Sequence, residues 1–223
     1  KTKVSQYDIL HVFKLDISSK RLIDYAKSVG LKIVISPIIA IDKGWVVDLY
    51  WLLKKLPVAT IYRQSFSICK NIDMMIVETP KEGRFLSRYY RVDKSKIHVI
   101  PNGVDDLYTK SKLIYSKIPT EDYSIVVARF DKNKNQLNLI RALKNQNINV
   151  VFIGGAAPSC PEYYNNCVKE AKDAHNIFFL GWLDSKSELF RSALSNAKIL
   201  ICPSFQETFG LSILEGMTVG ATP

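Results

Sequence analysis

Short apolar runs alternate along the chain with stretches that are polar or apolar at helical spacing. The runs predict strands at 9–13, 31–35, 72–77, 97–100, 124–128, 149–153, 177–180 and 199–202. The stretches between them predict helices at 19–29, within 78–92, at 136–143, 163–174 and 187–194, and from about residue 210. Strands that alternate with helices are typical of parallel sheets covered by helices. The predicted fold class is therefore α/β.

A polar, lysine-rich stretch without apolar periodicity interrupts this alternation at 106–120. We interpret it as a linker between an N-terminal domain, residues 1–105, and a C-terminal domain, residues 121–223. A chain of 223 residues is long enough for two small domains. No apolar run approaches the 18 residues of a membrane span. The mixed polar sequence at residue 1 does not resemble a signal peptide, and we expect none.

The net positive charge of the chain comes entirely from its first half. Residues 1–118 hold 21 Lys and Arg against 11 Asp and Glu, whereas residues 119–223 hold 10 against 10. This asymmetry favours an anionic partner for the first half, such as a phosphorylated or lipid-linked acceptor or an anionic membrane surface; simple solubility is the alternative. Nucleic acid is not favoured, because no basic stripe with interleaved aromatic residues occurs.

Two further features bear on location. Residues 45–70 are amphipathic, basic and rich in tryptophan, so they form either a helix packed on the sheet or one lying on an acidic membrane. The four cysteines contain no C-x-x-C pair, which favours reduced structural thiols in a cytoplasmic protein.

The stretch 199–220 carries the clearest candidate chemistry. A strand, a loop opening at Pro203 and a helix from about Gly210 form a geometry in which backbone N–H groups and the helix dipole hold an anion. We expect a phosphate at the amides of Phe209, Gly210 and Leu211. Glu207 and Glu215, with seven residues between them, would accept hydrogen bonds from sugar or ribose hydroxyls. The alternative is a capping Glu207 and an exposed Glu215.

The segment PSFQETFGLSILEGM resembles the Glu-x7-Glu segment of the family 4 (group 1) glycosyltransferases, which have the two-domain GT-B fold. The resemblance implies two Rossmann-like domains. It also implies that Glu207 contacts the transferred sugar and that Glu215 binds the ribose of the nucleotide. IPNGVD at 100–105 resembles the motif that ends the first domain of these enzymes.

Other segments extend the resemblance. ARFDKNKNQLNLIRAL is similar to the segment that supplies two diphosphate-binding cations, here Arg129 and Lys134, and together with Glu207 these are the expected catalytic residues. Gly154 and Gly155 match the loop over the donor, and Leu183 lies where the backbone reads the nucleobase. YDILHVF resembles the family's first-domain strand with His11 in a structural position, but Ser36-Pro37 stands where many members carry a histidine, so no catalytic histidine is carried over.

The resemblance implies a retaining, metal-independent hexosyltransferase that needs no cofactor. The donor would be a UDP- or GDP-sugar and the acceptor a saccharide or lipid-linked hydroxyl, in bacterial surface polysaccharide or glycolipid synthesis at the inner face of the cell membrane. The absence of an Asp-x-Asp pair agrees with metal independence. Two alternatives stay open: another GT-B enzyme, such as a phosphorylase or epimerase, and a domain that only binds nucleotide or membrane. By the same resemblance, both domains are expected to be incomplete at the chain ends.

Overall fold

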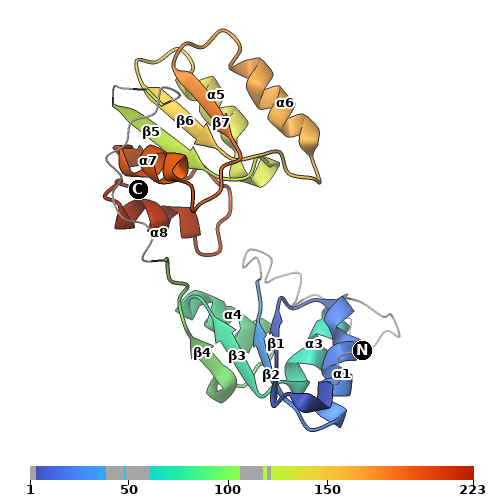
Figure 1. Ribbon diagram of the computed structural model, residues 1–223. Coiled ribbons are helices and arrows are strands. Elements are labelled where there is room, and N and C mark those ends of the chain that lie inside the picture. Colours follow the sequence, from blue (N-terminus) through green and yellow to red (C-terminus); the bar gives the residue numbers. More distant parts are fainter. Residues whose placement is uncertain (1–3, 39–47, 49–60, 106–117, 120–121) are drawn as a thin grey trace. The chain divides into compact units, whose positions relative to one another are not determined.

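A computed structural model describes residues 4–38, 48, 61–105, 118–119 and 122–223 (Figure 1). The chain divides into two compact units, Lys1–Asn102 and Gly103–Pro223. Residues 106–117 and 120 of the predicted linker 106–120 lie outside the described residues. Residues 45–47 and 49–60 of the amphipathic stretch 45–70 lie outside them as well.

The first unit is a parallel four-stranded sheet in the order β1-β2-β3-β4. Its strands are β1 (Ile9–Phe13), β2 (Lys32–Ser36), β3 (Met74–Val77) and β4 (Ile97–Val99), and its helices are η1 (Val4–Gln6), η2 (Ile17–Ser19), α1 (Lys20–Ser28), α3 (Ile61–Asn71), α4 (Pro80–Tyr89) and η3 (Lys94–Lys96). Alternate apolar residues of β2 and β3, such as Ile33, Ile35 and Met75, are buried in one core with Ile23 of α1 and Leu86 of α4.

Strand β3 is shorter than the predicted 72–77 because Asp73 has another role. Its carboxylate accepts the Ile33 N–H at 2.8 Å and pairs with the Lys27 ammonium at 3.0 Å. The residue thus joins α1, β2 and the start of β3, and the ladder begins at Met74.

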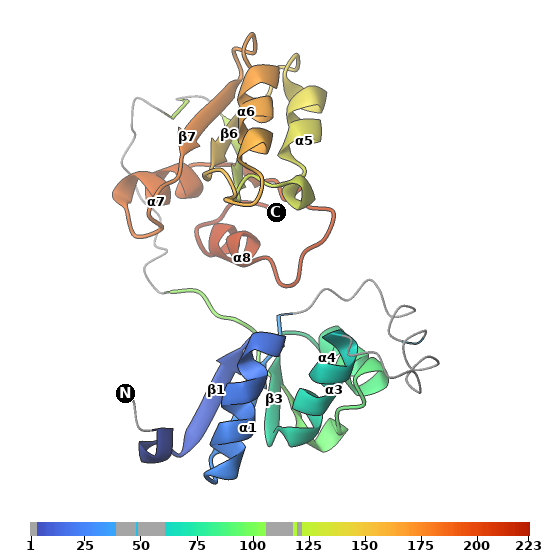
Figure 2. The same cartoon turned by 90° about the vertical axis from the view of Figure 1, so that its right-hand side faces the viewer.

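The second unit is also a parallel four-stranded sheet, in the order β7-β6-β5-β8. Its strands are β5 (Tyr123–Val127), β6 (Asn149–Ile153), β7 (Ile177–Gly181) and β8 (Ile199–Leu200), and its helices are η4 (Lys132–Lys134), α5 (Gln136–Leu143), α6 (Pro161–Glu170), α7 (Glu188–Ser195) and α8 (Leu211–Thr218). Helices α5 and α6 cover one face of the sheet, and α7 and α8 cover the other (Figures 1 and 2).

Alternation along the central strands produces the two cores of this unit. Ile125 of β5 and Val151 of β6 pack with Leu194 of α7, whereas Val126 and Phe152 point to the opposite face and pack with α5 and α6. A sheet that is buried on both sides requires strands with apolar residues on both faces. The continuous apolar runs predicted as strands are therefore explained by helices on both faces.

In the part of the chain that the structure describes, no helix combines the length and the apolar character needed to cross a membrane.

Candidate functional site

The strand order places a topological switch point in the second unit. The chain proceeds from β5 to β6 to β7 in one direction and then returns to the other side of β5 to form β8. In open α/β sheets, ligands bind beyond the carboxyl ends of the strands at such a point. The segments that follow β5 and β8, residues 128–136 and 201–210, meet here and contain half of the predicted site residues.

A pocket of about 320 Å³ lies beyond the carboxyl ends of β5, β6 and β7. It is lined by Val127, Ala128, Arg129, Ile153, Gly154, Gly155, Ala156, Trp182, Leu183 and Phe190. Four of the predicted residues, Arg129, Gly154, Gly155 and Leu183, are thus brought together. The lining residues are mainly apolar, and Arg129 is the charged residue among them. The volume is at the lower end of the range for small-molecule sites.

The two adjacent glycines of this pocket differ in their structural demands. Gly154 has a φ of +150°, and a Cβ on it would lie 2.0 Å from the carbonyl oxygen of Ala128. A Cβ on Gly155 would only reach ordinary contact with the Trp182 Cβ, at 3.5 Å. Gly154 therefore allows β5 and β6 to approach closely at the pocket wall, whereas Gly155 is not required for packing.

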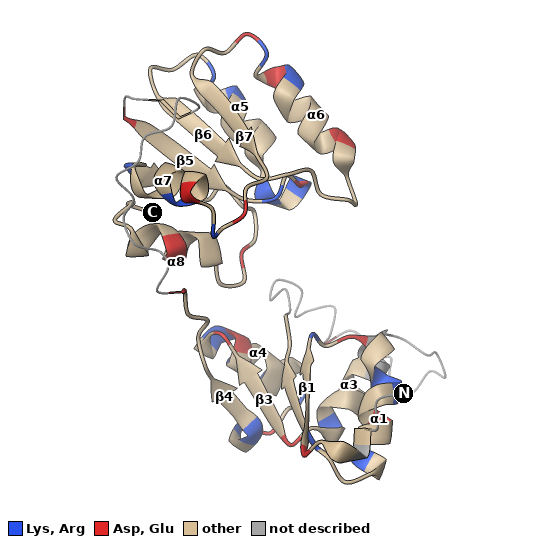
Figure 3. Ribbon diagram, viewed as in Figure 1, with Lys and Arg blue, Asp and Glu red and all other residues tan. Residues whose placement is uncertain are grey.

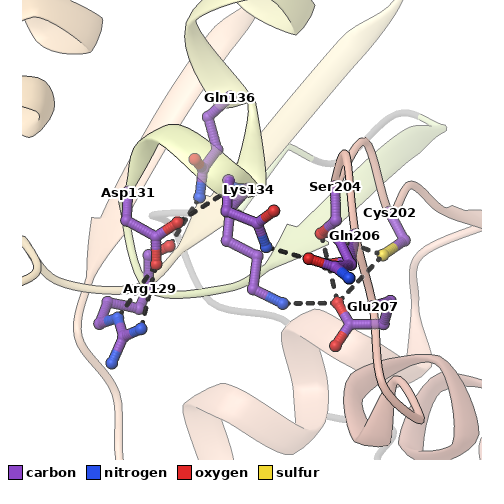
Figure 4. A network of polar contacts seen from close by, with 9 residues as sticks. Arg129, Asp131, Lys134, Gln136, Cys202, Ser204, Gln206 and Glu207 are labelled. Atoms are coloured by element: carbon purple, nitrogen blue, oxygen red, sulfur yellow. Dashed lines mark hydrogen bonds and ion pairs between the residues drawn. The ribbon is translucent and has the colours of Figure 1, made fainter. Parts of the chain in front are cut away.

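Arg129 and Lys134 are connected through a residue that the sequence analysis missed, Asp131 (Figure 4). The Arg129 Nε and Nη2 groups donate to Asp131 Oδ2 at 3.2 and 3.1 Å. Asp131 Oδ1 accepts the backbone N–H of Lys134 at 3.0 Å and so caps η4. An Asp directly before a helical stretch is an N-cap signal, from which this cap could have been found.

Lys134 reaches across the switch point to Glu207. Its ammonium lies 2.5 Å from Glu207 Oε2, and the two side chains are 24% and 29% exposed. The same oxygen accepts a hydrogen bond from the Ser204 hydroxyl at 3.3 Å. Two predicted catalytic residues that are distant in sequence are therefore in direct contact.

Three further hydrogen bonds hold the two loops together. The Asn133 side chain donates to Gln206 O at 2.8 Å, the Phe205 N–H donates to Asn133 O at 2.8 Å, and the Asn135 side chain donates to Pro203 O at 3.2 Å. Asn135 has a φ of +58°, a conformation that asparagine adopts more readily than most residues. These asparagines fix the loop that carries Glu207, a role that was not predicted from the sequence.

Helix α8 begins immediately after Gly210, whose φ of +82° favours glycine. The amides of Phe209, Gly210 and Leu211 thus lie at the N-terminal end of α8, where helix N–H groups lack intrahelical acceptors. Glu215 is half-buried in the middle of α8. These residues, like Lys134 and Glu207, do not line the pocket; they lie on the β8 side of the switch point.

The first unit carries polar side chains at the corresponding edge of its own sheet. His11 Nε2 lies 2.9 Å from the Ser36 hydroxyl, so this contact joins β1 to the end of β2. After β3, the Glu78 carboxylate accepts a hydrogen bond from the Asn102 side chain of the IPNGVD motif at 2.5 Å. The described residues of both units contain no group of three or more His, Cys, Asp or Glu side chains placed to hold a metal ion.

Two different family models match the first and the second half of the chain. The family model of the glycosyl transferases group 1 matches residues 109–223, more than half of the chain. The chain belongs to the group 1 glycosyl transferases. The model of glycosyltransferase family 4 matches residues 3–106 of this group 1 chain. The expected family membership is confirmed.

Two curated proteins are similar in sequence to this group 1 glycosyl transferase. D-inositol 3-phosphate glycosyltransferase of Corynebacterium aurimucosum is 29% identical over an alignment of 168 positions, and the match covers 67% of this chain and 39% of that protein. Alpha-maltose-1-phosphate synthase of Mycobacterium tuberculosis is 26% identical over an alignment of 174 positions, and the match covers 72% of this chain and 44% of that protein. The matched part of the chain thus spans less than half the length of these relatives.

Solved structures share the fold at lower sequence identity. Anabaena HepE, in complex with UDP and glucose, has a TM-score of 0.73 and 15% identity, and the match covers 97% of this chain and 58% of HepE. The lipopolysaccharide outer core galactosyltransferase WaaB has a TM-score of 0.61 and 18% identity, with 98% and 56% covered. These likenesses, with the two parallel sheets, confirm the expected α/β fold of two Rossmann-like units.

Proposed function

We propose that this chain carries the donor site of a retaining glycosyltransferase, which moves a sugar from a nucleotide-sugar donor to a hydroxyl group of an acceptor. The observation that carries the proposal is that two features meet at the switch point. One is an apolar pocket with Arg129 in its lining, and the other is the Lys134–Glu207 ion pair. Solved HepE has this fold and contains UDP and glucose, which supports a UDP-sugar as donor.

In this proposal the nucleobase occupies the apolar pocket between Leu183 and the exposed ring of Trp182. Trp182 is 75% exposed although it lines the pocket, and a flat base would cover part of this apolar surface. Hydroxyl groups of the ribose would donate to the Glu215 carboxylate on α8. The Gly155 backbone, which has room beside it, would lie along the ligand.

The diphosphate would lie between Arg129, Lys134 and the amides of Phe209, Gly210 and Leu211. When the bond between the sugar C1 and the diphosphate oxygen breaks, negative charge accumulates on the leaving phosphate. Fixed cations and N–H groups that face this charge stabilise the transition state more than the ground state. These groups supply positive charge without a metal ion, and we therefore expect that chelators do not affect turnover.

Glu207 would accept a hydrogen bond from a hydroxyl of the transferred sugar. Its Oε2 is engaged by Lys134 at 2.5 Å, so the arriving phosphate and the carboxylate compete for the same ammonium. Binding of the donor would free part of the Glu207 carboxylate for the sugar. The role of Glu207 is thus coupled to the occupation of the phosphate site.

Calorimetric titration with UDP, GDP and ADP tests the donor site and identifies the base. We expect one nucleotide to bind wild-type protein and to bind at least tenfold more weakly to Arg129→Ala and Glu215→Ala. Arg141→Ala is the matched control, because Arg141 is an exposed arginine of the same unit that pairs with Glu170 of α6 and does not line the pocket. Failure of all three nucleotides to bind folded protein would refute the donor site.

Turnover distinguishes an enzyme from a module that only binds. We expect release of UDP or GDP from the sugar donor to depend on an acceptor, to persist in EDTA, and to fall at least a hundredfold in Glu207→Gln. Proton NMR of the product, with the same anomeric configuration as the donor, would support retention. Donor loss without acceptor dependence would contradict transfer.

For the acceptor side, a specific observation favours an anionic membrane surface. Lys81, Arg84 and Arg88 are exposed and lie at helical spacing along α4, while its acidic residue, Glu82, is buried. Figure 3 marks the basic and acidic positions of the described residues along the ribbon. A helix face with cations only attracts anionic headgroups, as expected for a lipid-linked acceptor at the inner face of a cell membrane. We expect the protein to sediment with phosphatidylglycerol vesicles but not with phosphatidylcholine vesicles. Neutralising these three residues to Gln should abolish this, whereas Gln at Lys169, Lys172 and Lys186, which are also exposed, should not.

A further inference from the structure

The Arg129 side chain is held by hydrogen bonds although most of it is exposed. The side chain is 65% exposed, and a long exposed arginine ordinarily samples many rotamers. Here both of its ends are held. At the backbone, the fully buried Gln136 side chain donates to the Arg129 carbonyl oxygen at 2.9 Å. At the guanidinium, two N–H groups donate to Asp131 Oδ2 (Figure 4).

Asp131 is itself held rigidly. Its side chain is only 14% exposed, and its other oxygen caps η4 through the Lys134 N–H at 3.0 Å. One carboxylate therefore fixes the direction of the Arg129 side chain and the backbone position from which the Lys134 side chain extends. The geometry joins both cations of the site to a single acidic residue.

The contact with Asp131 leaves donors of Arg129 available. A guanidinium has five N–H donors, and Asp131 uses one on Nε and one on Nη2. The other three remain for an anionic ligand. Asp131 can thus orient Arg129 without taking the place of a phosphate.

We propose that Asp131 is a positioning residue of the donor site, which orders Arg129 and Lys134 before a phosphate ligand arrives. The inference rests on the proposed function. Preorganisation strengthens binding because the rotamer entropy of the arginine is lost during folding and not during binding.

A simpler role for Asp131 makes the opposite prediction. If Asp131 were only a counter-ion, its negative charge beside an anion site would weaken phosphate binding, and its removal would strengthen binding. If it positions Arg129, its removal weakens binding. The sign of the change therefore separates the two roles.

The test uses Asp131→Asn and Asp131→Ser in the full chain. Asn and Ser are both good N-cap residues, so each keeps the cap of η4 while the charge that orients Arg129 is lost. Asp93→Asn is the matched control, because Asp93 caps η3 of the first unit through the Ser95 N–H at 2.9 Å in the same way. The ligands for calorimetry are UDP and inorganic pyrophosphate.

We expect both Asp131 variants to bind UDP and pyrophosphate five- to twentyfold more weakly than wild type, with unchanged thermal unfolding, and Asp93→Asn to bind normally. In an Arg129→Ala background, Asp131→Asn should change affinity by less than twofold, because Asp131 then has no arginine to position. A merely structural effect of the substitution would persist in that background. Equal or tighter binding by the Asp131 variants would overturn the inference while leaving the proposed function intact. Absence of binding to wild-type protein would overturn both.

Discussion

Replacement of Gly154 by alanine tests the close approach of β5 and β6 at the pocket. The new Cβ would lie 2.0 Å from the Ala128 carbonyl oxygen and 2.8 Å from its carbonyl carbon. Both atoms belong to the backbone, so no side chain can rotate away. Because an ordinary C···O contact is roughly 3.3 Å, the two strands would have to separate locally by about 1.3 Å.

The cost can be worked out from the contacts that such a separation disrupts. Two ladder hydrogen bonds flank the site, from the Ala128 N–H to Ile153 O at 3.0 Å and from the Phe130 N–H to Gly155 O at 2.9 Å. Their loss costs about 1 kcal/mol each. The positive φ of Gly154 adds about 1–3 kcal/mol of strain for an alanine. The expected total is about 3–5 kcal/mol, a large fraction of the stability of about 5–15 kcal/mol of a typical domain.

Gly155→Ala is the control, since its Cβ meets only the Trp182 Cβ at 3.5 Å, and it should cost less than about 1 kcal/mol. Urea unfolding would give the free energies, and hydrogen exchange of the Ala128, Phe130 and Gly154 amides would localise the change to this unit. Equal stability of Gly154→Ala and wild type, or equal losses in the two variants, would refute the reasoning.

Three other substitutions have defined outcomes. Burial raises the pKa of the Glu82 carboxyl, which is 5% exposed, so ionisation opposes folding once the pH exceeds the unfolded value of about 4.3. Glu82→Gln should therefore raise the urea midpoint at pH 7–8, and this gain should disappear below pH 4; a gain independent of pH would contradict this cause. Trp182→Ala should weaken UDP binding about tenfold, as expected for loss of base stacking, and leave pyrophosphate binding unchanged in the same titration. Tyr123→Phe removes the buried hydrogen bond from the Tyr123 hydroxyl to Ala193 O at 2.6 Å and should cost about 1 kcal/mol of unfolding free energy, whereas no change in the urea midpoint would show that this bond is not stabilising.

Much of the fold follows from local sequence patterns. Short apolar runs predicted the strands of both sheets, and the intervening periodicity predicted most helices, because these signals depend on neighbouring residues. The motifs were equally local. Glu207 and Glu215 were found from one segment, and Arg129 and Lys134 from another.

The relations between those segments depend on the tertiary structure. No local signal indicates that β8 returns beside β5, and only this return brings Glu207 within 2.5 Å of Lys134. Asp131 and the asparagines after it resemble ordinary loop residues until the chain folds and their partners are in place. The sequence likewise gives no sign that Gly154 and Gly155, the two glycines of the pocket, differ in their structural roles. Gly154 alone is indispensable, because the neighbouring strand, remote in sequence, places a carbonyl oxygen where a Cβ would lie. Local patterns thus determined which elements form and which residues carry the chemistry, whereas strand order and close backbone approach decided which of these residues act together.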